Sequence, residues 1–365
     1  MDKHSAGPEP TIPPVDLQAQ LQHIRTSSLK DATILVTGGA GLVGSHIVDQ
    51  LIEAGVAQVR VLDSLVRGRR DHLAAAMART PERLLFIEGD VRDRSAVGRA
   101  TAGCDYVVHQ AALRITLCAE RPRECLDVLV DGTCNVFEAA AEHRVRKVVY
   151  ASSASVYGAA EIFPTPEEHH PYGNRTLYGS AKLMNEGLAR SWRHMYGLPS
   201  VGLRYFNVYG PRMDLSGAYT EVFVRWLDAA ERGERPIIHG DGSATMDCVY
   251  VEDVARANLL ALCAKRHDDV YNVASGTETS LLELWSAIRQ VTRVADGQPA
   301  MGEGLAGNLT QNDLAPLFQT PRKVNPVQRR QGDTSRAKSE LGFSASVTLE
   351  EGLRRLHKWR RGQRR

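Results

Sequence analysis

The chain has 365 residues, of which 43% are hydrophobic and 24% are charged, and its formal net charge is +2. These values are ordinary for a globular enzyme and give no reason to expect nucleic acid as a partner. No apolar run approaches the roughly 20 residues that span a bilayer, and no signal peptide is indicated. We therefore expect a cytoplasmic protein with no membrane partner.

The cysteines show neither CxxC pairing nor the spacing of metal ligands. Several lie in apolar surroundings, where a thiol acts as a small hydrophobic group. We therefore expect a reducing compartment and no metal site. The six cysteines are Cys104, Cys118, Cys125, Cys134, Cys248 and Cys263.

Residues 1–30 are polar and proline-rich at first and then carry a short helical pattern, Leu17, Leu21 and Ile24. We interpret them as an N-terminal appendage. After it, apolar runs typical of buried strands alternate with helical patterns. Strands are expected at 34–36, 59–62, 84–87, 106–108 and 147–151, and helices at 45–54 and 128–142. This alternation predicts a parallel sheet covered on both faces, with right-handed crossovers.

The predicted fold class is α/β, with a Rossmann-type doubly wound sheet formed mainly by residues 31–208. Beyond Tyr209 glycine and proline become frequent, and strands such as 236–238 are short. Residues 209–365 are expected to form mainly a smaller substrate-binding α/β domain, with some segments returning to the first domain. Residues 294–330 read as a long loop over the site, and 349–359 as a closing amphipathic helix.

A glycine-rich turn follows the first strand and opens the first helix. Such glycines allow a tight turn and a close approach of the backbone to a pyrophosphate, which then faces the N-terminus of the helix. The same pattern alone also fits an ordinary strand–helix turn. The residues expected to contact a dinucleotide here are Gly38, Gly41, Leu42, Val43 and Gly44.

Asp63 stands at the end of the second strand, where a carboxylate accepts hydrogen bonds from the adenosine ribose hydroxyls. A carboxylate there repels a 2′-phosphate, so NAD is favoured over NADP as the cofactor. Three arginines follow closely and could bind a 2′-phosphate instead, which would favour NADP: Arg67, Arg69 and Arg70.

Two further strand ends complete the expected cofactor site. Asp90 and Val91 follow the third strand, where they either meet the adenine edge or cap the strand. Ala111 and Ala112 follow the fourth strand, and their small side chains let the backbone approach the cofactor.

Tyr178 and Lys182 lie four residues apart, hence on one face of a helix. A tyrosine has an unperturbed pKa of about 10, which is high for a base at neutral pH. We expect the ammonium of Lys182 and a positively charged nicotinamide ring to lower that pKa. Ser153 closes the fifth strand at the edge that faces the ligand crevice, so its hydroxyl can share the reacting oxygen with Tyr178.

These motifs together resemble the extended short-chain dehydrogenase/reductase family, in its NAD-dependent nucleotide-sugar epimerase/dehydratase branch. The similarity runs from about residue 33 to 359 and rests on residues 37–44, 152–158, 178–182, 203–211, 239–242, 249–254, 333–338 and 341–343. The resemblance implies Ser153, Tyr178 and Lys182 as the catalytic set and NAD as the cofactor. It also implies contacts of Asn207 and Arg330 with the diphosphate of a nucleotide sugar, and a homodimer.

Enzymes of this branch begin alike, with removal of the 4-hydroxyl proton and of a hydride from C4. The resemblance implies that dehydratases carry an Asp–Glu pair just after the position of Ser153. This chain has Ala154 and Ser155 there, so a 4-epimerase acting on a UDP-sugar is the favoured function. A dehydratase or a keto-sugar reductase is the alternative, and a non-catalytic dinucleotide sensor is a remote one.

Three residues depart from the family pattern or have a structural interpretation. Met246 stands where relatives have a diphosphate-binding arginine, and we interpret it as an apolar wall residue; Arg330, Arg329 or Arg212 are the cations that could compensate. Leu129 replaces an asparagine near the cofactor. His109 ends the fourth strand among apolar neighbours, where a histidine is more often structural than catalytic.

Overall fold

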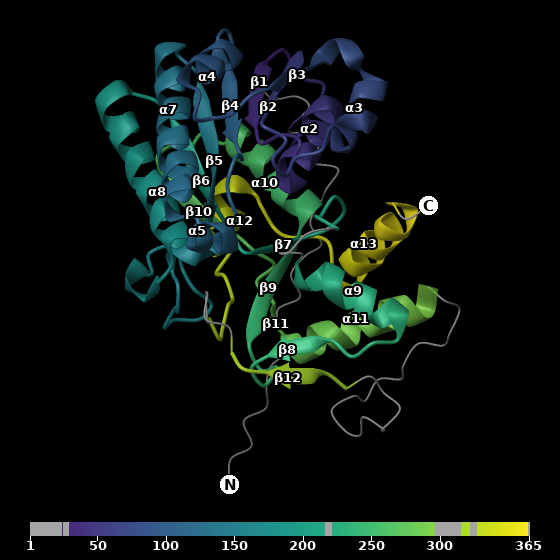
Figure 1. The fold of residues 1–365 in the computed structure, drawn as a ribbon. Coiled ribbons are helices and arrows are strands. Elements are labelled where there is room, and N and C mark those ends of the chain that lie inside the picture. Colours follow the sequence, from purple (N-terminus) through teal and green to yellow (C-terminus); the bar gives the residue numbers. More distant parts are fainter. Residues whose placement is uncertain (1–23, 25–28, 216–220, 296–314, 322–326, 364–365) are drawn as a thin grey trace.

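The computed structural model describes residues 24, 29–215, 221–295, 315–321 and 327–363. Its main body is a seven-stranded, fully parallel sheet in the order β10-β6-β5-β4-β1-β2-β3 (Figure 1). The predicted doubly wound sheet is confirmed, and its five predicted strands are among the seven. The strands are β1 (Thr33–Thr37), β2 (Gln58–Asp63), β3 (Leu84–Glu88), β4 (Tyr106–His109), β5 (Lys147–Ser153), β6 (Ser200–Tyr205) and β10 (Asp269–Val273).

Helices cover both faces of this sheet (Figure 1). Because each face is buried, the strands are apolar on both sides, and β5 has no exposed residue. One face carries α4 (Arg94–Thr101), α5 (Ile115–Glu120), α6 (Pro122–Leu126), α7 (Gly132–Glu142) and α8 (Leu177–Tyr196). The other carries α2 (Leu42–Ala54), α3 (Ala74–Arg79), α10 (Val251–Cys263) and α12 (Ser335–Leu341).

The smaller C-terminal part lies beyond the carboxyl ends of the strands and has its own apolar core. In that core the rings of Tyr209 and Phe223 stack at 4.8 Å, and those of Trp226 and Trp285 meet edge to face at 6.1 Å. Its sheets have the orders β11-β9-β7 and β12-β8. The elements are β7 (Asn207–Tyr209), β8 (Ile237–His239), β9 (Thr245–Tyr250), β11 (Glu278–Ser280), β12 (Leu317–Gln319), α9 (Val222–Arg232), α11 (Leu281–Ala295) and α13 (Leu349–Gln363).

Two expected elements differ from the structure. The predicted helix 128–142 is a π turn, Asp127–Asp131, followed by α7. Across their junction the Thr133 hydroxyl donates to the carbonyl of Leu129 at 2.6 Å, a bond that competes with the helical ladder. The expected loop 294–330 contains β12, which pairs with β8. Residues 296–314 and 322–326 of that loop lie outside the described residues.

The N-terminal segment contributes to the main core. Ile24 and Leu29 are both buried in the cluster that covers the α2 face of the sheet. The remainder of the expected helical pattern, Leu17 and Leu21, lies outside the described residues. Among the described helices none is both long enough and apolar enough to cross a membrane.

Candidate active site

A cavity of about 1080 Å³ runs along the carboxyl ends of the parallel strands and into the smaller part of the chain. Strand order reverses between β1 and β4, and such a switch point opens a crevice at this edge of a sheet. All of the residues predicted for the site line this one cavity: Gly38, Gly41, Leu42, Val43, Gly44, Asp63, Asp90, Val91, Ala111, Ala112, Ser153, Tyr178, Lys182, Asn207 and Arg330.

The glycine-rich turn leaves no room for side chains. Gly38 has φ +66°, and a Cβ there would lie 2.7 Å from the backbone nitrogen of Ala111. A Cβ on Gly44 would lie 2.2 Å from the carbonyl oxygen of Gly38. The helix α2 begins at Leu42 without a side-chain cap, so its N-terminal amides and its dipole are directed toward an anion in the cavity. This geometry fits the pyrophosphate of a dinucleotide.

The carboxylate of Asp63 is held firmly at the cavity wall. It accepts hydrogen bonds from the backbone nitrogens of Ala40 and Leu65, each at 2.9 Å. A Cβ on Gly68 would lie 2.6 Å from Oδ1 of Asp63, so the following loop packs tightly over the carboxylate. Asp63 is buried and its remaining lone pairs border the cavity, as a ribose acceptor requires.

The arginines after β2 are directed to other partners. Arg69 pairs with Asp71 at 3.4 Å, and Arg70 pairs with Glu88 at 2.8 Å. Arg67 lines the cavity, and burial followed by the charge of Arg114 lowers its pKa to about 10. This arrangement favours NAD over NADP, because two of the three cations already have acidic partners.

Asp90 shows features of both of its expected roles. It lines the cavity, yet its carboxylate accepts the backbone nitrogen of Arg92 at 2.9 Å and pairs with the Arg92 guanidinium at 2.7 Å. Hydrogen bonding from that side chain lowers the pKa of Asp90. Val91 is buried at the same strand end, and Ala111 donates its backbone N–H to Thr37 Oγ1 at 3.3 Å.

Tyr178 and Ser153 meet at the chemical end of the cavity. Tyr178 lies in the first turn of α8, which is capped by the hydroxyl of Thr176. Ser153 ends β5, and its hydroxyl accepts the backbone N–H of Ser155 at 3.1 Å. Burial raises the pKa of Tyr178 to about 12, and its hydrogen bond with Ser153 partly offsets this rise. The phenol is therefore protonated at neutral pH in the protein itself.

Lys182 lies one turn beyond Tyr178 on α8 and is buried. Its ammonium donates to the carbonyl of Ala151 at 2.7 Å and lies 5.8 Å from the centre of the Tyr178 ring. Burial lowers the pKa of Lys182 to about 8. The pKa of the phenol is thus raised rather than lowered, because removal from water is the largest cause of the shift at Tyr178 as at Lys182.

The cavity wall carries polar atoms that no protein group satisfies. Asn207 Oδ1, Thr116 Oγ1 and Arg212 Nη1 are buried atoms of cavity-lining residues and have no hydrogen-bond partner. Because unsatisfied buried polar atoms are rare in proteins, they indicate a polar ligand. Arg330 also lines the cavity, and burial lowers the pKa of its guanidinium to about 10.

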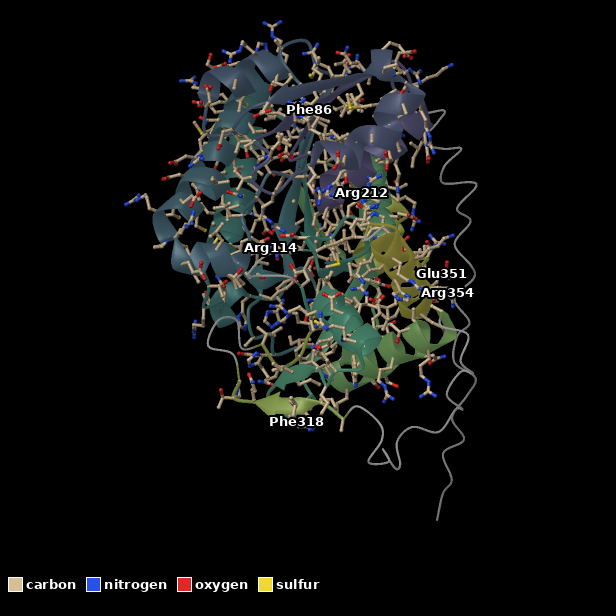
Figure 2. All side chains as sticks on the ribbon, turned by 45° about the vertical axis from the view of Figure 1, so that its right-hand side comes forward. Phe86, Arg114, Arg212, Phe318, Glu351 and Arg354 are labelled. Carbon is tan, nitrogen blue, oxygen red and sulfur yellow. The ribbon has the colours of Figure 1, made fainter. Side chains whose placement is uncertain are left out.

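The cations expected to compensate for Met246 separate into two groups. Arg329 is bound by Glu278 through bonds of 2.8–3.0 Å and does not line the cavity. Arg212 lines the cavity and donates to Asp49 of α2 at 2.6 Å. In Figure 2 it lies in the middle of the molecule, between Phe86 and Phe318. Met246 is part of the cavity wall and packs against the C-terminal core, as its apolar interpretation predicts.

His109 and Leu129 lie outside the cavity lining. The ring of His109 joins Thr37 Oγ1 at 2.7 Å and Thr133 Oγ1 at 3.0 Å, and burial lowers its pKa to about 3. Since the Thr133 hydroxyl donates to Leu129, it accepts from Nε2 of His109, and that nitrogen carries the proton. His109 is thus a neutral structural bridge.

Sequence reasoning missed two polar networks at this site. Tyr205 at the end of β6 donates to Gln110 at 3.1 Å, and both contact Asn258. Glu186 and Arg204 form a buried ion pair behind Ser153. No spacing signal marks either network, because their partners are far apart in the chain.

The comparisons with known proteins agree with this geometry. A family model described as "NAD dependent epimerase/dehydratase family" matches residues 34–274, and the chain belongs to this family. A putative UDP-glucose 4-epimerase of Methanocaldococcus jannaschii is 34% identical over 91% of this chain and 99% of its own.

Two solved structures share the fold. The UDP-glucose 4-epimerase of Thermotoga maritima, solved with UDP-glucose, has a TM-score of 0.79 and 32% identity, covering 91% of this chain and 100% of its own. The dTDP-glucose 4,6-dehydratase DesIV of Streptomyces venezuelae, solved with NAD bound, has a TM-score of 0.77 and 27% identity, covering 91% and 98%. The chain is thus an enzyme of an NAD-dependent nucleotide-sugar family that includes both epimerases and dehydratases.

Proposed function

We propose that this chain is a 4-epimerase of a UDP-linked sugar. The proposal rests on the combination of the Ser153–Tyr178–Lys182 set with Ala154 and Ser155, which carry no carboxylate next to it. Six carboxylates line the cavity in the described part of the chain, and each already binds a cation or a backbone amide. They are Asp63, Asp71, Asp90, Glu124, Asp214 and Glu221. An elimination needs an additional acid at C6, whereas epimerisation needs none.

In this mechanism the glycine-rich turn, Asp63 and Lys182 would hold NAD, which would supply a reversible hydride acceptor for C4 of the sugar. Tyr178 takes the proton of the 4-hydroxyl and later gives it back, while Ser153 donates a hydrogen bond to the reacting oxygen. Lys182 holds a positive charge one helical turn away and stabilises the phenolate when it forms. Tyr178 is partly buried at the cavity wall and hydrogen-bonds with Ser153, so the two oxygens are placed to share the proton.

The nucleotide end supports a diphosphate. Arg330 supplies a cation at the cavity wall, and Asn207 supplies a buried carbonyl oxygen without a protein partner, which accepts a hydroxyl or N–H of the substrate. A uridine nucleotide is proposed because the Thermotoga maritima relative was solved with UDP-glucose. We also propose that residues 31–208 mainly hold NAD and residues 209–365 mainly hold the sugar nucleotide.

A homodimer is proposed through the outer faces of α7 and α8. Three apolar side chains of α8 are exposed in the single chain: Met184, Met195 and Tyr196. Two such helices from each subunit form a four-helix arrangement, which buries these side chains. The measurement is the molar mass in solution, and a monomer at micromolar concentration would contradict this part of the proposal.

The experiment mixes the purified protein with a panel of UDP-, dTDP- and GDP-sugars without added NAD. The expected result is conversion of a UDP-sugar to its C4 epimer with no net change in NADH. Tyr178→Phe should abolish this turnover and leave the NAD content unchanged. Tyr172→Phe, which alters an exposed tyrosine, is the matched control and should keep full activity.

Other products would overturn the assignment. A 4-keto-6-deoxy sugar would show a dehydratase, and consumption of added NADH with a keto-sugar would show a reductase. Near-normal activity of Tyr178→Phe would remove Tyr178 from the mechanism.

A further inference from the structure

A buried ion pair lies directly behind the catalytic groups. Glu186 is on α8, one helical turn beyond Lys182, and is 1% exposed. Arg204 of β6 binds its two carboxylate oxygens from Nε and Nη2 at 2.8 and 2.7 Å. Ser152, which directly precedes Ser153 on β5, donates to the same carboxylate at 2.5 Å. One carboxylate thus connects the helix of Tyr178 to the strand of Ser153.

Arg204 extends the connection to the segment that follows Ser153. Its Nη1 donates to the hydroxyl of Tyr157 at 2.8 Å and to the carbonyl of Glu167 at 2.7 Å. The Tyr157 hydroxyl then donates to Asn272 Oδ1 of β10 at 2.7 Å. Because charge-assisted bidentate bonds are directional, this network restricts both sliding and rotation of α8 over the sheet.

We propose that Glu186 and Arg204 are positioning residues that hold Ser153, Tyr178 and Lys182 in mutual register for the reaction. This inference rests on the proposed function of that catalytic set. Neither residue lines the cavity, so neither is expected to touch substrate or NAD. A buried ion pair is a weak source of net stability, which makes a positional role the better account of its retention behind the site.

Glu186 also acts on the charge of Lys182. The titratable groups that face this ammonium are Tyr178 and Glu186 on its own helix, Cys118 on α5, Cys125 on α6 and His109 on β4. Burial is the main cause of the lowered pKa of Lys182, and the charge of Glu186 opposes it. Without that charge the pKa of Lys182 falls further, so the ammonium is lost at lower pH.

The test compares Glu186→Gln with Asp253→Asn, which breaks another buried ion pair whose residues do not line the cavity. Asp253 and Arg256 are also buried, 1% and 7% exposed in their side chains, and are joined at 2.8 Å. Both variants are expected to lower the thermal unfolding midpoint. Glu186→Gln should reduce kcat about tenfold or more with a change in KM below about threefold, whereas Asp253→Asn should retain the kcat of the wild type.

A second readout does not depend on turnover. The Lys182 side-chain nitrogen is followed by NMR during a pH titration and assigned by its loss in Lys182→Met. Its midpoint should fall in Glu186→Gln and stay unchanged in Asp253→Asn. Ser152→Ala is the substitute if Glu186→Gln does not fold. It removes the hydrogen bond from Ser152 to Glu186, keeps the ion pair, and should lower kcat by about threefold.

The outcomes separate this inference from the proposed function. An unchanged Lys182 midpoint in Glu186→Gln, or equal kcat losses in Glu186→Gln and Asp253→Asn, would overturn the positioning role. A wild type without epimerase activity would overturn the function, while the Lys182 titration would still test the ion pair.

Discussion

The pH dependence of turnover follows from the two shifted groups of the site. With a pKa of about 12 for Tyr178, only roughly 10⁻⁵ of the phenol is ionised at pH 7, and each added pH unit raises this fraction tenfold. With a pKa of about 8, Lys182 is mostly protonated below pH 8, and its protonated fraction falls about tenfold for each pH unit above it. The active form needs the phenolate and the ammonium together.

The logarithm of the product of these two fractions rises by one per pH unit up to about pH 8. Above that pH the product is constant, because the gain in phenolate is offset by the loss of ammonium. We expect kcat/KM for epimerisation to increase about tenfold per unit between roughly pH 6 and pH 8 and then to flatten. A positive nicotinamide ring lowers both pKa values, which moves the bend to lower pH without changing its shape.

The assay measures initial rates of epimer formation with the NAD-loaded protein in buffers of constant ionic strength. Protein stability is recorded at each pH, so that loss of folded protein is not mistaken for titration. A rate that is independent of pH from about 5 to 8 would refute the reasoning, because the phenol would then already be ionised over the whole range.

Two further predictions concern the frame of the site. Gly44→Ala should weaken NAD binding at least about tenfold, because its Cβ would lie 2.2 Å from the Gly38 carbonyl oxygen. The amount of NAD that copurifies with the protein measures this effect. The control is Gly98→Ala, which has open space around the new Cβ and should retain NAD. Lys147→Met should destabilise the fold by about 3 kcal/mol in chemical unfolding, because the ammonium binds three carbonyls at the end of α10 and the variant leaves them buried without a donor. A loss below about 1 kcal/mol would show that water replaces the ammonium there.

The sequence identified those parts of the molecule whose signal is local. Buried parallel strands appear as continuous apolar runs, so the positions of β1 to β5 could be predicted. Tyr178 and Lys182 share a helix face by their spacing, and Ser153 ends a strand, so the parallel topology alone brings these three residues to one edge. The glycine pattern predicted a turn that the close approaches at Gly38 and Gly44 confirm.

Features that depend on partners distant in the chain could not be predicted. The strand β12 forms because residues 317–319 pair with β8, about 80 residues away, and its own composition gives no strand pattern. The π turn Asp127–Asp131 has no counterpart in the spacing of apolar residues, which predicts a continuous helix. The unsatisfied oxygen of Asn207 becomes visible only when the buried surface is known. The sequence shows the proximity of Tyr178 to Lys182 but not the burial that raises the pKa of the phenol; the expected effect of a bound nicotinamide ring on that pKa stays a prediction.

The high pKa of Tyr178 and the neutralised carboxylates of the cavity are consistent with the same kind of chemistry. In an epimerisation one oxygen takes a proton and returns it, so the catalyst must be a competent acid as well as a base. A phenol with a pKa of about 12 holds its proton at neutral pH in the resting protein. A dehydration needs a second proton for the leaving hydroxyl, and each carboxylate that borders the cavity in the described chain is already bound to a cation or an amide. If introducing Asp and Glu at Ala154 and Ser155 produced a 4-keto-6-deoxy sugar, the difference between the two reactions would lie in this second proton source rather than in Tyr178.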